Sequence, residues 1–509
     1  MASQFQEHLP AGPDKLSKDS LGVFGVVFLV LAAVAPLTGI IVITALGLAL
    51  GNGAGMVGSF IVVTAILLLF GVGYAQMSKL LVSAGGFYAV VLKGLGKPAA
   101  LVAALVAMLG YNCFVAGAIG TIGFFMQTVI AQLTGLNVHW FIWALVAVAA
   151  AFLLSRQGID FSAKVLGVGL ILEVSILVIF DIAVLIRDGY TLDVFSPGVV
   201  FSGAAGIGFL FAANAFVGVE ATGLFSEEAR NPRRTIPRAT YTAIGFIGLL
   251  AAMTTWAIVS ALGTAEAQGA AAEHLATGDL VFVLSADYLG EGLTTLMMVL
   301  LLVSLFAALM ALHNSATRYI YSLGRARIIT PRLSRTRANG VPQRASVAQF
   351  TSGIVVSGLF AAFGMEPLTS LIPSMTGFGT LGILTLQLVA TLAIVVHFRK
   401  TRDRRLWSTF LAPGIGLLGL GVVVILAISN FSVLAGSDAP IITLLPWLLV
   451  AAIVGGLLLA RHLRWNKPEI FAGLGQDLER LPLESGDAKA KPEADYSAQL
   501  VPNTQEETS

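Results

Sequence analysis

Residues 32–40 read AAVAPLTGI and residues 211–220 read FAANAFVGVE, and these two stretches decide how the chain folds. Each places helix-breaking or polar residues in the middle of a long apolar run: a proline and a glycine in the first, an asparagine, a glycine and a glutamate in the second. A helix in lipid has to satisfy its own backbone hydrogen bonds, so breaks are tolerated only where the freed groups face protein, water or a ligand. The two stretches therefore predict two broken membrane helices at a binding site. The alternative is a proline kink in the first helix and a packing face of small residues in the second.

The composition is that of a membrane protein. Of 509 residues, 57% are hydrophobic and only 11% are charged, and the mean hydropathy is +0.88. A soluble domain carries about 25% charged residues on its surface, so the outer surface of this chain has to face lipid. The one cysteine, Cys113, excludes an intramolecular disulfide, and its apolar surroundings favour a packing role.

A membrane span needs about 20 apolar residues. This rule predicts an all-α integral membrane protein with about twelve transmembrane helices, at residues 21–50, 55–78, 98–131, 138–155, 162–186, 203–227, 239–263, 290–322, 345–363, 368–397, 408–430 and 441–461. The first run is too long for the apolar region of a cleaved signal peptide. We expect a cytoplasmic N-terminal segment at 1–20, a transmembrane domain at 21–465, and a disordered cytoplasmic tail at 466–509, which is rich in Pro, Glu, Lys, Ser and Gln.

The positions of the charges predict the orientation. With a cytoplasmic N-terminus, all 30 Lys and Arg residues except Arg187 lie on the cytoplasmic side, whereas acidic residues populate the outer segment 264–289. Cytoplasmic loops carry the excess of Lys and Arg. This pattern predicts a multi-pass protein of the cell membrane with both termini in the cytoplasm.

The two breaks suit a zwitterionic or cationic ligand. The half-helix that starts near Thr38 directs free N–H groups and the positive end of a helix dipole at the break, where an anion binds well. The half-helices that end near Ala35 and Ala213 offer free carbonyl groups, which suit an ammonium group. An amino acid or a small amine is the expected ligand.

A longer motif extends the second stretch. Residues 216–221 (FVGVEA) and 227–239 (EEARNPRRTIPRA) resemble the helix 6 signature of the amino acid–polyamine–organocation (APC) permeases. Three further segments are similar to that family: GGFY at 85–88, RYIYSLGR at 318–325, and TGI at 38–40. The resemblance covers about residues 20–460. It implies a five-plus-five inverted repeat with broken helices 1 and 6, two extra helices, and transport by alternating access.

The resemblance also implies a substrate site. It assigns the substrate carboxylate to Thr38, Gly39 and Ile40, and the amino group to the backbone around Phe211, Asn214, Ala215 and Phe216. Two positions depart from the family pattern. Leu37, preceded by Pro36, replaces the first glycine of the helix 1 motif, and an amine without a carboxylate does not need that glycine. Asn214 stands where the similar arginine/agmatine exchanger has a gating tryptophan, which implies a different gate or a polar contact to substrate.

Polar residues on other helices complete the expected site. Tyr111 and Asn112 interrupt an apolar run in a region that lines the site in similar permeases, and packing is the alternative. His313 and Asn314 form another polar pair, for which hydrogen-bonded packing is favoured. A cluster at the inner mouth forms an intracellular gate or follows the positive-inside rule; its members are Glu227, Glu228, Arg230, Arg233, Arg234 and Arg238.

Acidic residues within membrane helices are costly and mark function by default. Glu173, near the centre of helix 5, is the leading candidate for proton coupling, since burial favours the protonated form of a carboxyl group. The alternatives are a contact to the cationic group of an amine, or a neutral glutamic acid bonded to a neighbouring helix. Glu220 either couples protons or caps helix 6. Asp181, two turns outward from Glu173, is expected to face water.

These features predict a secondary active transporter that imports an amino acid or small amine, with proton symport as the leading mechanism. The alternatives are an antiporter of an amino acid against an amine, and a transporter-like membrane sensor. The sequence contains no P-loop motif and no arrangement of a nucleophile and a base, so we expect neither an enzyme nor a cofactor or metal site. The expected partners are the substrate, a coupling proton and the bilayer, with no nucleic acid, and helices 11 and 12 are candidates for a homodimer face.

Overall fold

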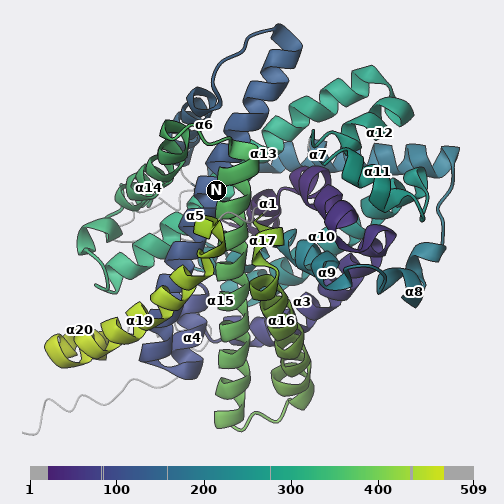
Figure 1. Ribbon diagram of the computed structural model, residues 1–509. Coiled ribbons are helices and arrows are strands. Elements are labelled where there is room, and N and C mark those ends of the chain that lie inside the picture. The colour runs from purple at the N-terminus through teal and green to yellow at the C-terminus, as the bar shows by residue number, and fades with distance from the viewer. Residues whose placement is uncertain are drawn as a thin grey trace, which may run out of the picture.

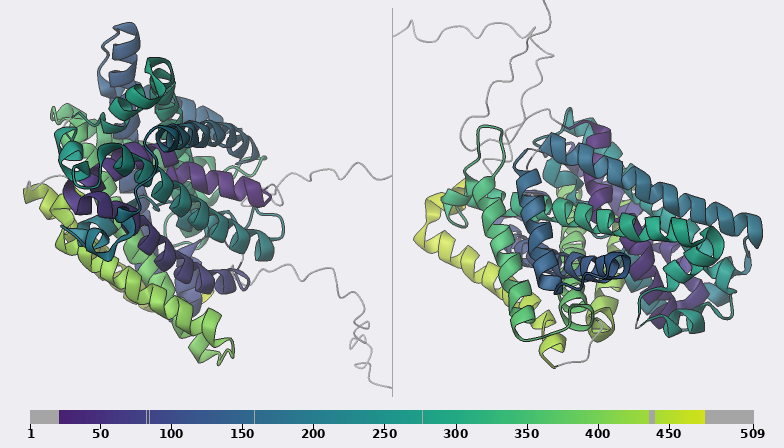
Figure 2. Two further views of the ribbon diagram at one scale, coloured as in Figure 1. Left: turned by 90° about the vertical axis from the view of Figure 1, so that its right-hand side faces the viewer. Right: turned by 90° about the horizontal axis from the view of Figure 1, so that it is seen from above.

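The computed structural model describes residues 21–474, except residues 82, 84, 158, 276 and 436–439. The predictions for residues 1–20 and 475–509 lie outside this range. The described part is a bundle of helices (Figures 1 and 2). It contains no strand, and its one isolated backbone bridge joins Leu21 to Ala229.

The helical elements follow the predicted spans closely. The α-helices are α1 (Val23–Val34), α2 (Pro36–Thr38), α3 (Met56–Ser78), α4 (Phe87–Leu95), α5 (Lys97–Thr134), α6 (Trp140–Ser155), α7 (Ile159–Arg187), α8 (Pro197–Val200), α9 (Ala205–Asn214), α10 (Pro232–Leu262), α11 (Ala267–Glu273), α12 (Leu280–Leu289), α13 (Glu291–Arg325), α14 (Gln343–Ala362), α15 (Ile372–Lys400), α16 (Ala412–Ser429), α17 (Phe431–Leu434), α18 (Pro440–Thr443), α19 (Pro446–Asn466) and α20 (Pro468–Gly473). The π-helical segments are η1 (Gly39–Thr44), η2 (Gly47–Asn52), η7 (Pro367–Leu371) and η8 (Trp407–Leu411), and the 3₁₀ segments are η3 (Gly53–Gly55), η4 (Asp193–Phe195), η5 (Val219–Phe225) and η6 (Pro331–Ser334).

The membrane architecture agrees with the prediction. Ten helical stretches of the described chain are long and apolar enough to cross a bilayer. The first, Val23–Ser78, spans 56 residues and contains two of the predicted helices, and a further predicted helix is the shorter apolar α6. The predicted all-α membrane fold is confirmed.

The first predicted break falls between α1 and α2. Ala35 adopts a left-handed conformation with φ of 51°, and Pro36, which has no N–H group, begins the next helical segment. A left-handed conformation is uncommon for a residue with a side chain, so the surrounding structure has to hold it in place. The chain then continues in π-helical turns, a form that is frequent at functional sites.

The second predicted break falls between α9 and η5. Helix α9 ends at Asn214, and Gly218 has φ of 116°, which favours glycine. A Cβ atom on Gly218 would lie 3.1 Å from the backbone carbon of Ala33, so the glycine also lets the two broken helices approach closely. Segment η5 packs against α1, and α9 packs against η2. The halves of two antiparallel broken helices therefore pack pairwise across the centre of the bundle.

The exterior of the bundle is apolar. Large hydrophobic side chains such as Ile186 on α7, Leu418 on α16 and Trp465 on α19 are more than 70% exposed. In the interior, α15 packs closely along α5 (Figure 1), with Gly110 facing Gly382. One boundary differs from the prediction: residues 468–473, assigned to the disordered tail, form α20. The physical reason is that Phe471 packs beside the Lys97 ammonium, which bonds to the carbonyl oxygen of Ala472 at 2.9 Å.

Candidate functional site

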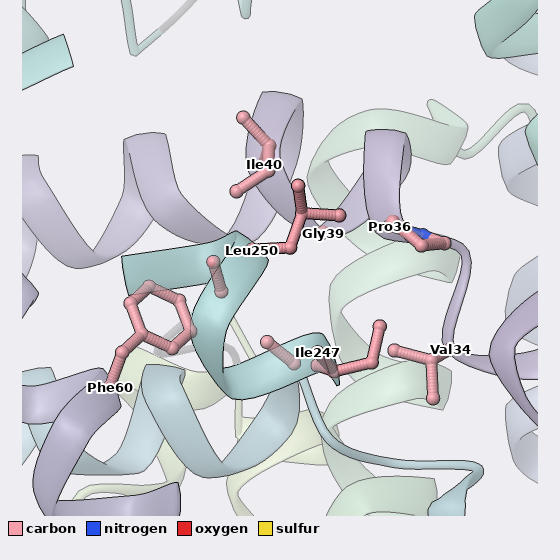
Figure 3. A pocket seen from close by; sticks show the side chains of 9 residues that line it. Val34, Pro36, Gly39, Ile40, Phe60, Ile247 and Leu250 are labelled. Carbon is pink, nitrogen blue, oxygen red and sulfur yellow. The ribbon is translucent and has the colours of Figure 1, made fainter. Parts of the chain in front are cut away.

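The first break opens onto a very small apolar cavity (Figure 3). Its volume is about 10 Å³, roughly one water probe sphere. The lining residues come from the broken first helix, from the break after α9, and from α3 and α10; they are Val34, Pro36, Gly39, Ile40, Phe60, Ala215, Ile247, Leu250 and Ala251. Three predicted site residues (Gly39, Ile40 and Ala215) thus lie around one point. In this conformation the lining side chains leave only this small space at the break.

Glu173 of α7 reaches the same break. Its side chain is 1% exposed. One carboxylate oxygen, Oε2, accepts hydrogen bonds from the Ser304 hydroxyl at 2.7 Å and from the Leu37 backbone N–H at 3.4 Å. The Thr38 hydroxyl donates to Ser304 at 3.3 Å, which joins a second predicted site residue to the group. A buried acid from α7 therefore accepts a hydrogen bond from a backbone N–H that the break has freed.

Glu220 belongs to a second group, around the other break. Its side chain is 3% exposed. It accepts hydrogen bonds from the Tyr111 hydroxyl at 2.8 Å, the Gly218 N–H at 2.9 Å and the Gln387 amide at 3.2 Å. These donors belong to α5, to the break itself and to α15. Glu220 therefore links the break between α9 and η5 to α5 and α15.

Two ion pairs close the end of the bundle beyond η5. Glu228 and Arg318 form a doubly hydrogen-bonded pair, with both contacts at 2.8 Å and side chains that are 3% and 4% exposed. Glu227 pairs with Arg325 in the same way, at 2.9 and 2.5 Å. The backbone of Leu21 exchanges hydrogen bonds with Glu228 and Arg230. The residue before α1, the chain after η5 and the C-terminal part of α13 are thus held together.

The family model for amino acid permeases matches residues 21–458. The chain belongs to this family. The permease is 25% identical over 488 residues to the branched-chain amino acid permease BcaP of Bacillus subtilis (strain 168), an alignment that covers 89% of the permease and 96% of the relative. It is 28% identical over 255 residues to the uncharacterized transporter Rv1999c of Mycobacterium tuberculosis, covering 49% of the permease and 52% of that protein. The family places the chain in the APC superfamily, as its motifs indicate.

The remaining predicted site residues divide between the break and the core of the permease. Phe211 and Phe216 are each 1% exposed and pack beside the sixth-helix break. Asn214 is 8% exposed, and its side-chain amide makes no hydrogen bond within the described chain, so it is available to a ligand. Asn112 turns elsewhere: its amide donates to the Met108 carbonyl at 2.7 Å and its oxygen accepts from Ser352 at 2.8 Å.

Two polar residues outside the breaks are buried in the permease. His313 is fully buried, stacks on Phe350 with ring centroids 3.6 Å apart, and contacts Gln349 and Ser346. This arrangement agrees with hydrogen-bonded packing. Asp181 was expected to face water, and this is wrong. It is 7% exposed and accepts a hydrogen bond from Thr254 at 3.0 Å, because α10 packs along this side of α7.

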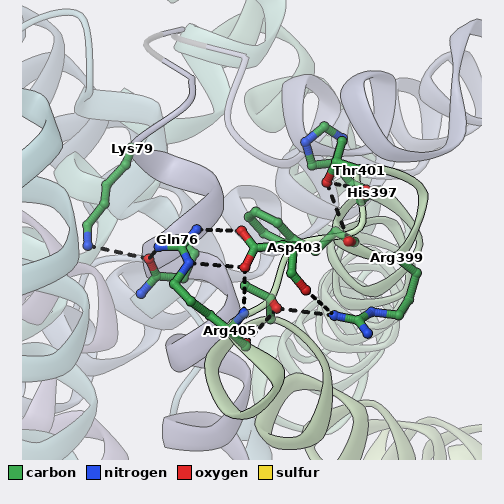
Figure 4. A network of polar contacts seen from close by, with 9 residues as sticks. Gln76, Lys79, His397, Arg399, Thr401, Asp403 and Arg405 are labelled. Carbon is green, nitrogen blue, oxygen red and sulfur yellow. Dashed lines mark hydrogen bonds and ion pairs between the residues drawn. The ribbon is translucent and has the colours of Figure 1, made fainter.

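A polar network joins the loop after α15 to the end of α3 (Figure 4). Arg405 donates to Asp403 at 2.7 and 3.1 Å, and to the Gln76 side chain at 3.0 Å. The hydrogen bonds from Arg405 lower the pKa of Asp403 to about 2. This loop therefore keeps its ion pair at physiological pH in the permease.

Sequence reasoning missed Ser304 and Gln387. Ser304 has no local signal, because small polar residues are common in membrane helices. Gln387 interrupts the apolar run of α15 and had the same kind of signal as Asn112. Both are identified only by the acids to which they donate.

Proposed function

We propose that this permease imports a small aliphatic amino acid across the cell membrane together with a proton, by alternating access. Three observations support the substrate class. The chain is an amino acid permease, the Bacillus relative is named a branched-chain amino acid permease, and the cavity at the first break is lined by apolar residues only. A charged substrate side chain at that cavity would lie unpaired in an apolar environment, which is costly.

The substrate backbone would bind at the breaks. The backbone N–H near Thr38, at the start of α2, suits its carboxylate, whereas the Gly39 N–H already bonds to the Ala35 carbonyl at 2.9 Å. The Asn214 side chain with the carbonyls at the end of α9 suits its ammonium group. The aliphatic side chain would then contact Ile40 and Phe60. We further infer that both termini are cytoplasmic, which places the Glu228–Arg318 pair at the inner mouth.

Competition in proteoliposomes tests the substrate class. Radiolabelled leucine uptake is measured against an excess of isoleucine, valine, lysine, glutamate or putrescine. We expect inhibition by isoleucine and valine and none by the charged compounds. Inhibition by putrescine without inhibition by isoleucine would instead favour an amine substrate.

Coupling is proposed to run through Glu173, and the contact from the Leu37 N–H to its carboxylate carries this proposal. An ionised Glu173 holds a donor at the place where the substrate carboxylate binds, and two carboxylates at one site repel each other. A proton on Glu173 removes this charge and weakens its hydrogen bond to the donor. The substrate therefore binds best after the proton, and the two enter together.

The variant Glu173→Gln separates binding from coupling. Glutamine retains an oxygen acceptor for Leu37 and Ser304 and cannot release a proton. We expect leucine exchange between preloaded vesicles to persist, whereas accumulation driven by an inward proton gradient is lost. Glu291→Gln, at an exposed acid that begins α13, is the matched control and retains both activities. Full accumulation by Glu173→Gln would refute the assignment, and exchange without accumulation in the unmodified protein would favour an antiporter.

A further inference from the structure

A basic hollow lies at the end of α13, remote in sequence from both breaks. Its volume is about 480 Å³, within the range of small-molecule pockets. Its lining includes four arginines together with two hydroxyl residues; the set is Arg325, Arg327, Arg332, Arg335, Thr330 and Ser334. We use the term basic hollow for this set.

Three of the four arginines are free to bind a ligand. Arg327, Arg332 and Arg335 are exposed and form no ion pair within the described chain. The fourth, Arg325, forms the wall nearest η5 and pairs with Glu227. Like charges around one hollow repel each other, so an anion placed there would be stabilised.

The backbone supports a shaped site. Arg327 has φ of 56°, a left-handed conformation that helix ends usually give to glycine. Its N–H bonds to the Gly324 carbonyl at 3.1 Å, and the Ile328 N–H bonds to the Leu323 carbonyl at 3.0 Å. This turn folds the chain back so that η6 lies beside the end of α13. An excess of cations on the cytoplasmic side explains why arginines are present, but it does not explain why they converge on one hollow.

We propose that the basic hollow binds a phosphate-bearing anion, either the headgroup of an anionic phospholipid or a soluble phosphate compound. Guanidinium groups bind phosphate oxygens through paired hydrogen bonds, which suits arginine better than lysine. Basic pockets at the cytoplasmic ends of membrane helices bind anionic headgroups. Arg325 lines the hollow and also pairs with Glu227. A bound phosphate therefore competes with Glu227 for Arg325 and weakens the contact between the chain after η5 and the end of α13.

The test is a binding measurement on the full-length protein in detergent. The protein is heated with each probe, and tryptophan fluorescence reports the unfolding temperature. The probes are phosphatidylglycerol, phosphatidylcholine and glycerol phosphate. We expect phosphatidylglycerol or glycerol phosphate to raise the unfolding temperature by several degrees with saturation, and phosphatidylcholine to have no effect. A response to phosphatidylglycerol alone identifies a lipid site, and equal responses at equal phosphate concentration identify a soluble anion. No response to either overturns the proposal.

A matched pair of variants makes the site specific. In the first, the three free arginines of the hollow become glutamine, and we expect half-saturation to need at least tenfold more anion. In the control, Lys400, Arg402 and Arg404 become glutamine, which removes the same charge from the last residue of α15 and the loop after it. Equal weakening in both variants would show general charge attraction and overturn the site. Arg332→Gln alone, at an exposed position, gives the same comparison if the triple variant does not fold. Because no transport is measured, failure here leaves the proposed import untouched.

Discussion

Replacing Glu228 with glutamine removes the negative charge of a buried ion pair and leaves the Arg318 guanidinium charged, buried and without its anionic partner. Breaking a buried pair from one side costs about 3–5 kcal/mol. A tenfold change in an equilibrium corresponds to about 1.4 kcal/mol. The equilibrium between the closed arrangement, in which the chain after η5 contacts α13, and an open one should therefore shift toward the open one by a factor on the order of 10² to 10³ or more. In Glu228→Gln/Arg318→Gln both charges are gone, and we expect most of this loss to be recovered.

Cysteine labelling measures the shift. In a Cys113→Ser background, a cysteine replaces Ala221, which is 1% exposed and lies in η5 between the acids Glu220 and Glu228. We expect a water-soluble maleimide to label it at least tenfold faster in Glu228→Gln than in the parent, with the double variant close to the parent. Asp287→Asn breaks the exposed pair with Arg187 and is the control with no change, since such pairs contribute about 0–1 kcal/mol. Equal labelling in Glu228→Gln and parent, with folding verified by gel filtration, would refute the reasoning.

Three further outcomes are expected. Tyr111→Phe removes a hydrogen bond to the buried carboxylate of η5, which should cost about 1–3 kcal/mol and lower the thermal unfolding temperature; an unchanged temperature would show that this bond contributes nothing. Gly94→Ala would place a Cβ atom 2.2 Å from a backbone oxygen of α15 and should lower the yield of folded protein, whereas Gly245→Ala, with open space around it, should not; equal yields would contradict this packing. Asp403 has a pKa of about 2, below its usual value of about 3.9, so its pair with Arg405 stabilises the fold above pH 4 and this contribution is lost as the pH falls toward 2. The difference in unfolding temperature between Asp403→Asn and parent should be constant from pH 7 to 5 and shrink below pH 4. A difference that stays constant down to pH 3 would contradict this.

The fold and the two breaks could be predicted because their signals are local. Pro36 lacks a backbone donor and Gly218 supplies a conformation that other residues resist, so each marks a break without any knowledge of its neighbours. The alternation of apolar runs with basic loops gave the helices in the same way. In the described structure the two breaks fall at Pro36 and Gly218, and the helices follow the apolar runs.

Partners in space could not be predicted, because they depend on the rotation of each helix about its own axis. The inner acids were grouped with the nearby Arg233 and Arg234, yet those side chains are exposed, and Arg318 and Arg325 of α13 form the ion pairs. Asp181 was placed against water for the same reason. One helical turn decides whether such a group faces lipid, water or another helix, and hydropathy does not resolve it.

Simultaneous recording of leucine entry and internal pH in proteoliposomes tests proton-coupled import most directly. A pH-sensitive dye is enclosed in the vesicles, leucine is added outside with no imposed gradient, and potassium with valinomycin clamps the voltage. The account predicts that the lumen acidifies in step with leucine entry, and that Glu173→Gln abolishes the acidification. Leucine entry without acidification in the unmodified protein would contradict proton symport, and acidification retained in Glu173→Gln would contradict the assignment of the proton to that residue.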